Sequence, residues 1–354
     1  MSDLKFFNAL KIVLKDRFNK LDSAIDKYKT FENIWNNFDT VVNGFGLKKE
    51  ITNKNIDVDY EYEKILKRGS KIVTIRDDNY PKSLREIYMP PLGLYIEGDE
   101  ELFNKGTNLA VIGARNATQY GKEAMEKIFG ELTGYNINIV SGLARGIDTC
   151  AHTEALMNNL KTIAIIGSGF NRFYPKENQA LADNIIENGG AVVSEYPVDF
   201  YPEKYYFVAR NRLISGMSKA TLIIEAKKRG GSLITAKFAI EQNRDVLVVP
   251  NSIFAINSEG TNNLIKEGAK LVDSGKDIIA ELGIENMNKE YLTVFLNEKQ
   301  KVIINLFEKR KELDAKTISE LSDFTIPEII TELTILELSG ILKPTKNNQY
   351  IKIV

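Results

Sequence analysis

The sequence predicts an α/β fold built on a doubly wound parallel sheet, with a helical domain before it and a small helix-and-strand domain after it. Two stretches carry this prediction, AVIGARNATQYGKEA at 110–124 and IVSGLARGIDTCAH at 139–152. Each is a short apolar run that ends in glycine and continues into a polar turn and a helical pattern. Similar runs recur to about residue 282, and continuous apolar runs suit a sheet covered on both faces.

Length and composition limit the classes of protein to which the chain can belong. At 354 residues the chain is too long for one typical core, so two or three domains are expected. The net charge of −1 gives no global sign of a nucleic-acid partner, and only local charge could indicate one. No apolar run approaches the roughly 18 residues of a membrane span, and the start lacks a signal peptide's apolar core. We therefore expect a cytoplasmic protein that does not contact a membrane.

Cysteine and histidine are almost absent. The single cysteine, Cys150, and the single histidine, His152, exclude an internal disulfide and a Cys/His zinc cluster. Side chains two residues apart on a helix do not face each other, so a catalytic Cys–His pair is not expected. His152 is expected to be a buried histidine at a helix–sheet contact. No metal or cofactor is predicted, and GARNAT lacks two glycines of the dinucleotide-binding motif.

Residues 1–70 are predicted to form a helical domain. The segments FFNALKIVL, FENIWNNF and YEYEKILKRG indicate short helices, with Phe31, Trp35 and Phe38 as core residues. A helix-hairpin-helix that grips a DNA backbone is the alternative, and GFG at 44–46 supplies only a weak version of its hairpin. The prolines of MPP at 89–91 exclude a helix there.

Residues 71–284 contain the predicted sheet, and 93–98 adds a strand before the repeated pattern. The later apolar runs end at Gly113, Gly142, Gly167, Tyr196, Ala226 and Pro250. Helices are expected between them at 118–133, 146–159, 177–188, 232–243 and 260–268. Ligands of such open sheets bind at the carboxyl ends of the strands, which is where the unusual polar residues fall.

Residues 285–354 indicate three helices followed by a two-stranded wing, the pattern of a winged helix. Its third helix, from Ile326 to Leu338, carries three glutamates and no lysine or arginine. A DNA recognition helix needs cations or neutral donors that face phosphates and bases. A protein-contact role is therefore favoured over DNA binding for this domain.

Four segments place cations at the predicted strand ends. Gly113 to Arg115 offers backbone amides and a guanidinium to a phosphate, and Gly146 opens a helix within SGLARGID at 141–148. GFNRFYPKEN at 169–178 interleaves cations with aromatic residues, a pattern that suits single-stranded nucleic acid. Residues 203–245 hold nine Lys/Arg against four Asp/Glu.

Each of these residues also has a structural interpretation. A lone arginine after a strand is commonly a surface ion pair, and Phe173 and Tyr174 could be core residues. Arg210 and Arg212 could be structural cations, with Glu195 and Glu225 as candidate partners. The recurrence of cations at equivalent strand ends favours a ligand site.

The ordered blocks of this sequence resemble the DNA-processing protein A family (DprA, also called Smf). The similarity covers about residues 75 to 280 and is carried by AVIGARNATQYG, IVSGLARGIDTCAH, IIGSGFNRFYPKEN, VVSEYP, FVARNRLISGMS, IIEAKKRGGSLITAKFAIEQNRDVLVVP and GTNNLIKEGA. Seven blocks in the right order are far more specific than one glycine motif. The family's core is Rossmann-like, and many members carry a helical N-terminal domain and a winged-helix tail.

The resemblance implies single-stranded DNA binding, a homodimer through the core, and loading of the recombinase RecA on DNA taken up in natural transformation. The family's Gly-Ser-Arg loop corresponds to Gly113, Ala114 and Arg115, and its pocket lysine to Lys176. The dimer segment corresponds to GTNNLIKEGAKLV, with Leu264, Ile265 and Leu271 as its apolar residues. The DNA contacts expected from the four segments and the resemblance together are Gly113, Ala114, Arg115, Gly142, Arg145, Gly146, Arg172, Lys176, Asn178, Arg210, Asn211, Arg212, Gly231 and Ser232.

An enzyme acting on a nucleotide derivative is the alternative function. A related Rossmann-like family cleaves nucleoside monophosphates with a PGGxGTxxE loop, and RGGSLITAK at 229–237 has a similar place here. Arg229 stands where that proline belongs and Lys237 where the glutamate belongs. The missing carboxylate disfavours this chemistry, and no catalytic residue is predicted.

Overall fold

The structure, a computed structural model, describes residues 2–46, 55–284, 296–307, 310–338, 341–345 and 349–352. The chain divides into two compact units, one of residues 1–133 and 137–278 and one of 134–136 and 279–354. None of the helices in the described ranges combines the length and the apolar character that crossing a membrane requires.

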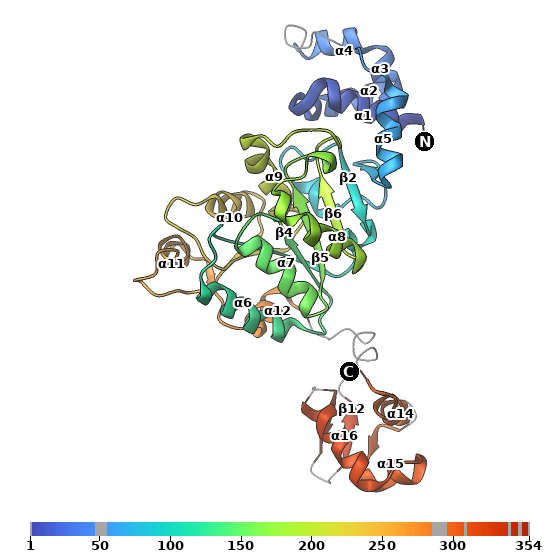
Figure 1. The fold of residues 1–354 in the computed structure, drawn as a ribbon, viewed down its shortest axis with the longest axis vertical. Helices are drawn as coiled ribbons and strands as arrows, with labels where there is room; N and C mark the ends of the chain where they lie inside the picture. Colours follow the sequence, from blue (N-terminus) through green and yellow to red (C-terminus); the bar gives the residue numbers. More distant parts are fainter. Residues whose placement is uncertain are drawn as a thin grey trace. The chain divides into compact units, whose positions relative to one another are not determined.

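The larger unit is organised around a sheet whose described strands lie in the order β1-β2-β6-β5-β4-β3-β7-β8-β9 (Figure 1). The strands are β1 (Lys71–Thr74), β2 (Gly93–Gly98), β3 (Thr107–Ile112), β4 (Ile137–Ser141), β5 (Lys161–Ile166), β6 (Ala191–Ser194), β7 (Ala220–Ile223), β8 (Asp245–Val248) and β9 (Lys270–Leu271). The strands from β3 to β9 pair in parallel, whereas β1 and β2 join antiparallel at one edge. The predicted α/β class with a large, mostly parallel sheet is confirmed.

Helices connect these strands. They are η3 (Lys82–Glu86), η4 (Glu100–Asn104), α6 (Gln119–Leu132), α7 (Ile147–Met157), η5 (Phe170–Arg172), η6 (Lys176–Asn178), α8 (Gln179–Glu187), α9 (Lys204–Gly216), α10 (Gly231–Glu241), α11 (Glu259–Lys266) and α12 (Gly275–Leu282). The strand order reverses at β3, so right-handed crossovers place the helices of the two halves on opposite faces. In Figure 1, α7 and α8 cover β4, β5 and β6.

The expected helices are all present, whereas α9 and α12 were not expected from the sequence. In α9, the buried residues Tyr206, Arg210, Leu213 and Ile214 follow the i, i+4, i+7, i+8 spacing of one helix face, but a charged arginine stands among them. A charge within the buried face weakens the apolar stripe by which a helix is recognised in sequence.

The N-terminal residues form α1 (Ser2–Leu14), η1 (Lys15–Leu21), α2 (Asp22–Tyr28), α3 (Phe31–Asn36), α4 (Phe38–Gly44) and α5 (Val58–Arg68). The side chains of Thr30 and Asp57 accept hydrogen bonds from the first turns of α3 and α5. Phe31, Trp35 and Phe38 are buried, as predicted. α4 ends at Gly44, and a helix that would follow the GFG turn lies outside the described residues.

The N-terminal helices and the sheet share one hydrophobic core. Phe7 packs against Tyr95 of β2, with ring centroids 6.1 Å apart, and the Tyr95 hydroxyl donates to Asn8 Oδ1 at 2.7 Å. A Cβ atom on Gly93 would lie 2.5 Å from the Phe7 ring, so glycine allows this approach. The same apolar cluster extends from α1 to strands β2, β5 and β6. Helices and sheet therefore bury each other's apolar surface.

The smaller unit contains α14 (Glu298–Phe307), β10 (Glu312–Leu313), α15 (Ala315–Leu321), α16 (Ile326–Leu338), β11 (Leu342–Pro344) and β12 (Tyr350–Lys352). Its strands pair in the order β10-β12-β11. Two of the α16 glutamates bond to α14, since Glu328 lies 2.7 Å from Lys299 and Glu332 accepts from Gln300 at 2.7 Å. Part of the acidic character of α16 therefore serves packing within this unit.

Candidate functional site

A cleft of about 660 Å³ opens at the carboxyl ends of β3, β4 and β7. These strands flank the point where the strand order reverses, which is where open α/β sheets bind their ligands. Its walls are the loop 112–116 after β3, residues after β4, one face of α9, and the segment 227–235 that leads into α10. The cleft thus gathers three of the four segments that the sequence singled out, and Tyr174 contributes from the fourth.

Glycines hold the loop after β3 against the start of α7. A Cβ on Gly113 would lie 2.6 Å from Ile147, and a Cβ on Gly146 would collide with the carbonyl of Ala114. Gly146 also has a φ of +81°, which favours glycine. The Ile147 amide donates to the Ala114 carbonyl at 3.1 Å. These contacts place Ala114 and Arg115 in the lining of the cleft.

Arg210 supplies a buried positive charge to the wall of the cleft. Its guanidinium donates to the Gly142 carbonyl at 2.5 Å and to the Ile165 carbonyl, at the ends of β4 and β5. Burial lowers the pKa of Arg210 to about 10, so it remains charged at neutral pH. A Cβ on Gly142 would overlap this guanidinium, which explains the glycine there.

Asp148 is a carboxylate that interacts electrostatically with this charge. It lines the cleft at the first turn of α7 and is buried. Burial raises the pKa of Asp148 to about 6, although Arg210 favours its charged form. The carboxyl therefore changes charge near physiological pH.

Three exposed cations stand around the cleft. Arg115, Lys204 and Lys227 all line it, and none has an ion-pair partner among the described residues. The backbone N–H groups of Gly231 and Ser232 add donors, because the first turn of α10 leaves amides without intrahelical partners. Unpaired cations and a helix N-terminus favour an anionic ligand such as phosphate.

Aromatic and aliphatic side chains share the cleft with these cations. The rings of Tyr174 and Phe207 lie 5.4 Å apart, and Tyr174 is exposed. Val208 and Ile234 are also exposed in the lining. An anion carrying flat apolar groups would find both kinds of partner here.

Several predicted contact residues do not line the cleft. Arg145 forms an exposed ion pair with Glu177, and Asn178 is buried, donating to the Leu143 carbonyl at 2.8 Å. Arg172 lies over the Tyr201 ring, 4.3 Å from its centroid, and Lys176 is exposed on η6. The predicted residues that do line the cleft are Gly113, Ala114, Arg115, Arg210, Asn211, Gly231 and Ser232.

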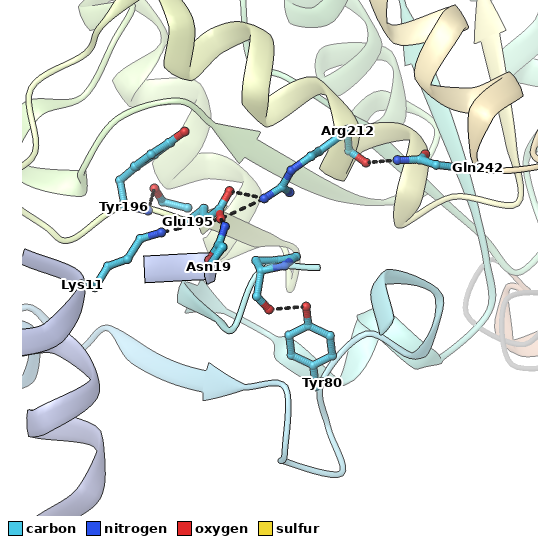
Figure 2. A network of polar contacts seen from close by, with 9 residues as sticks. Lys11, Asn19, Tyr80, Glu195, Tyr196, Arg212 and Gln242 are labelled. Atoms are coloured by element: carbon cyan, nitrogen blue, oxygen red, sulfur yellow. Dashed lines mark hydrogen bonds and ion pairs between the residues drawn. The ribbon is translucent and has the colours of Figure 1, made fainter. Parts of the chain in front are cut away.

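Arg212 lies outside the cleft and acts as a structural cation. One of its guanidinium nitrogens is 2.9 Å from both carboxylate oxygens of Glu195, as the alternative interpretation anticipated. Figure 2 shows Lys11 and Asn19 of the N-terminal helices pointing to the same carboxylate, at 3.6 Å and 2.6 Å. Residues 210 and 212 project from opposite sides of α9, so only Arg210 can reach the cleft. This network fixes α9 from its far side.

The Glu195 carboxylate is charged despite its burial. Burial alone would raise its pKa, but Arg212 and Lys11 outweigh that effect and hold the pKa of Glu195 below its ordinary value. The Gln242 side chain donates to the Arg212 carbonyl at 2.9 Å, which joins α10 to the same network (Figure 2).

Lys204, Phe207 and Val208 belong to the cleft but were not among the predicted contacts. With Asn211 they are spaced at i, i+3, i+4 and i+7, so they form one face of α9. This spacing could have identified these residues as one face of a helix, but only if the segment had been recognised as helical. Lys227, at the end of the β7 segment, was likewise counted only as part of the local positive charge.

The predicted dimer residues differ in exposure. Leu264 is only 9% exposed and packs in the core of its own unit. Ile265 is partly buried, whereas Leu271 is 45% exposed on β9, the last strand of the sheet. Of the three, Leu271 is the most exposed.

His152 is a structural histidine, as predicted. It is fully buried on α7, and its Nδ1 lies 2.7 Å from the Thr162 hydroxyl of β5. Burial lowers the pKa of His152 to about 3, so the ring is neutral at physiological pH.

The fold and the cleft define an α/β protein with a cationic, partly aromatic ligand site at the reversal of its sheet. Residues 71–283 match the family described as DNA recombination-mediator protein A. The chain belongs to this family.

Curated relatives agree with this assignment. The chain is 47% identical over 208 residues to the DNA processing protein DprA of Streptococcus pneumoniae, covering 59% of this chain and 73% of that protein. It is 39% identical over 220 residues to DprA of Bacillus subtilis, covering 62% and 74%.

Solved structures show the same similarity. The X-ray structure of S. pneumoniae DprA matches with a TM-score of 0.60 and 44% identity, over 64% of this chain and 78% of that one. DNA processing protein A of Helicobacter pylori, in a structure that concerns its single-stranded DNA binding mode, matches with a TM-score of 0.54 and 32% identity, over 60% and 95%.

Proposed function

We propose that this protein binds single-stranded DNA in the cleft and acts as a recombination mediator without chemistry of its own. The observation that carries the proposal is the cleft lining, which combines the unpaired cations Arg115, Lys204 and Lys227 with the Tyr174–Phe207 ring pair. Cations follow the backbone of a single strand, while aromatic rings stack on its unpaired bases. Lys176, two residues after Tyr174, is also exposed.

Family membership supports the wider role. We propose a cytoplasmic homodimer that loads RecA on single-stranded DNA entering by natural transformation. Residues 71–284 would carry DNA binding, residues 1–70 would support that core, and residues 285–354 would form a winged helix for protein contact. The order of helices and strands in the smaller unit and the lack of lysine and arginine in α16 support the last part.

Single-stranded oligonucleotides should bind more tightly than duplexes of the same length, with little sequence preference. The reason is that a duplex hides the base faces which Tyr174 and Phe207 would contact. Affinity should also fall steeply with salt, because phosphate contacts release counterions. Fluorescence anisotropy with labelled oligonucleotides at several salt concentrations measures both effects. Equal affinity for single-stranded and duplex oligonucleotides would contradict the proposal.

DNA affinity should rise as the pH falls from 7.5 to 5. The raised pKa of Asp148, about 6, means that a negative charge in the cleft is neutralised over this range. Removing that repulsion should strengthen binding about five-fold, which corresponds to about 1 kcal/mol at a partly screened separation. In Asp148→Asn the pH dependence should disappear. If both proteins show the same pH profile in anisotropy titrations, another group is responsible.

Leu271→Glu should give a folded monomer. Leu271 is exposed on the terminal strand β9, and a charge placed there in a two-fold interface is felt once from each subunit. Light scattering at micromolar concentration measures the change. Leu264→Ala is the control, because it should lower the free energy of unfolding by about 2–5 kcal/mol and leave the assembly intact. A Leu271→Glu protein that stays dimeric would place the interface elsewhere.

The alternative, an enzyme acting on a nucleotide derivative, has little support in the cleft. Lys237, at the position of the required glutamate, is exposed on α10 and lies 3.7 Å from Glu241. Detection of free base released from nucleoside monophosphates would support this alternative directly.

A further inference from the structure

The loop between β8 and α11 carries the most exposed apolar side chains near the cleft. Ile253, Phe254 and Ile256 are 81%, 92% and 75% exposed, and we call these three residues the apolar tip. Single exposed apolar residues are ordinary, but three within four positions, including an almost fully exposed phenylalanine, mark an interaction site.

The apolar tip is held in place by the hydrogen bonds of its own loop. The Ala255 amide donates to the Ser252 carbonyl at 3.0 Å, and the Ser258 hydroxyl donates to the Ala255 carbonyl at 2.7 Å. At the base of the loop, the Asn262 side chain donates to the Asn251 carbonyl at 3.0 Å. The projection of the tip is therefore built into the turn.

The same loop is attached to the wall of the cleft. The Asn257 side chain donates at 2.9 Å to the carbonyl of Asn116, which lines the cleft beside Arg115. The Asn257 carbonyl accepts from the Ala226 amide at 2.9 Å, next to Lys227 of the lining. A Cβ on Gly260 would lie 2.6 Å from the Lys227 carbonyl, so the two segments are in close contact.

Positive charge leads from the cleft toward this loop. Lys227, Lys228 and Arg229 are consecutive and exposed, and Lys228 also pairs with Glu259 at the start of α11. A strand that leaves the cleft along these cations would bring its bases to the apolar tip. Exposed rings beside cations are the arrangement that single strands use for stacking.

We propose that the apolar tip is an additional binding site for the bases of single-stranded DNA, with Phe254 as its stacking residue. This inference rests on the proposed function of the cleft and extends it to nucleotides outside the cleft. A second copy of the chain is the competing occupant, because the predicted dimer segment begins at Gly260, directly after this loop, although the three side chains alone are fewer than the roughly 20–30 residues per side of a stable interface. The neighbouring cations also favour a polyanion over a second copy of the same surface.

The test compares a short oligothymidine of about 5 nucleotides, which fills the cleft, with one of about 20 that can reach the tip. Phe254→Ala in the full-length chain should weaken binding of the long oligonucleotide about ten-fold and leave the short one within two-fold. Tyr88→Ala is the matched control, because Tyr88 is an 86% exposed aromatic residue outside the cleft lining and its loss should change neither affinity.

A second measurement reports on stacking directly. Phe254→Trp should retain the affinity for the long oligonucleotide, and the fluorescence of the introduced indole should be quenched on its binding. The chain has only one other tryptophan, the buried Trp35, so the new signal is readily assigned. The short oligonucleotide should not quench it.

Other outcomes overturn the inference in distinguishable ways. Unchanged binding of the long oligonucleotide by Phe254→Ala removes the tip from the DNA path but leaves the cleft intact. A Phe254→Ala protein that becomes monomeric by light scattering, with weakened DNA binding as a consequence, assigns the tip to a second copy. Failure of the unmodified protein to bind either oligonucleotide refutes the proposed function itself.

Discussion

Replacing Arg115 and Lys227 together with alanine should weaken single-stranded DNA binding by about two to four orders of magnitude. Each is an exposed cleft cation without an ion-pair partner in the described part of the chain, so each is free to contact a phosphate. Charge-assisted contacts contribute about 1.5–3 kcal/mol each, which adds to about 3–6 kcal/mol for the pair. The slope of log affinity against log salt should fall by about two.

Two further proteins test this expectation. Lys237→Ala removes an exposed lysine that lies outside the cleft lining, and it should change affinity by less than about two-fold, as surface charges away from a site do. Removal of residues 296–354 should leave affinity within a few-fold, because the smaller unit is compact by itself. Loss of binding on that removal, with normal binding by the double variant, would assign DNA binding to the smaller unit.

Glu195→Ala should destabilise the larger unit by about 3–5 kcal/mol, since it removes the buried carboxylate that the buried Lys11 and the partly buried Arg212 share. Denaturant unfolding of the full-length protein measures the loss. Glu63→Ala is the matched control, because its partner Lys67 and Glu63 itself are both exposed, and such pairs contribute about 0–1 kcal/mol. Equal losses in the two variants would show that the Glu195 network contributes no more than a surface pair.

The same network predicts a pH dependence. The pKa of Glu195 in the folded protein is lower than its ordinary value, so its contribution is fully present above the ordinary pKa and is lost as the pH falls through the folded pKa. The difference in unfolding free energy between the unmodified protein and Glu195→Gln should therefore shrink in acid. A difference that grows as the pH falls would contradict this assignment.

The strands and the position of the cleft were predictable from local signals. Apolar runs that end at Gly113 and Gly142 mark strand ends, and the order of strand and helix brings such ends to one edge of a sheet. The structure adds the reason for these glycines, since a Cβ at either position would strike Ile147 or Arg210.

The roles of individual side chains were less predictable, because they depend on which way a helix faces. Arg210 and Arg212 are two arginines of the same segment and could not be distinguished by sequence. In the structure, α9 directs Arg210 to the cleft and Arg212 to Glu195. Leu264 and Leu271 both lie in an apolar segment, and only the fold distinguishes the core residue from the exposed one. Without α9 as a known helix, its cleft face could not be inferred.

Contacts between distant segments leave no local trace in the sequence. The glutamates of α16 were interpreted as part of a protein-contact surface, whereas two of them bond to α14. The contacts of Lys11 and Asn19 in the N-terminal helices with Glu195 likewise could not be predicted from the spacing of residues in the sequence.

That attachment has a consequence for how the chain is made. Asn19 and its partner Glu195 are 176 residues apart, and at about 5–20 residues per second a ribosome needs about 10–35 s to synthesise what lies between them. During that interval Lys11 and Asn19 have been synthesised, whereas Glu195 and the β6 part of the shared apolar cluster have not. The N-terminal helices therefore lack part of their final packing partner for about half of the synthesis of the chain, and chaperone binding to this first segment is expected to determine the yield of folded protein.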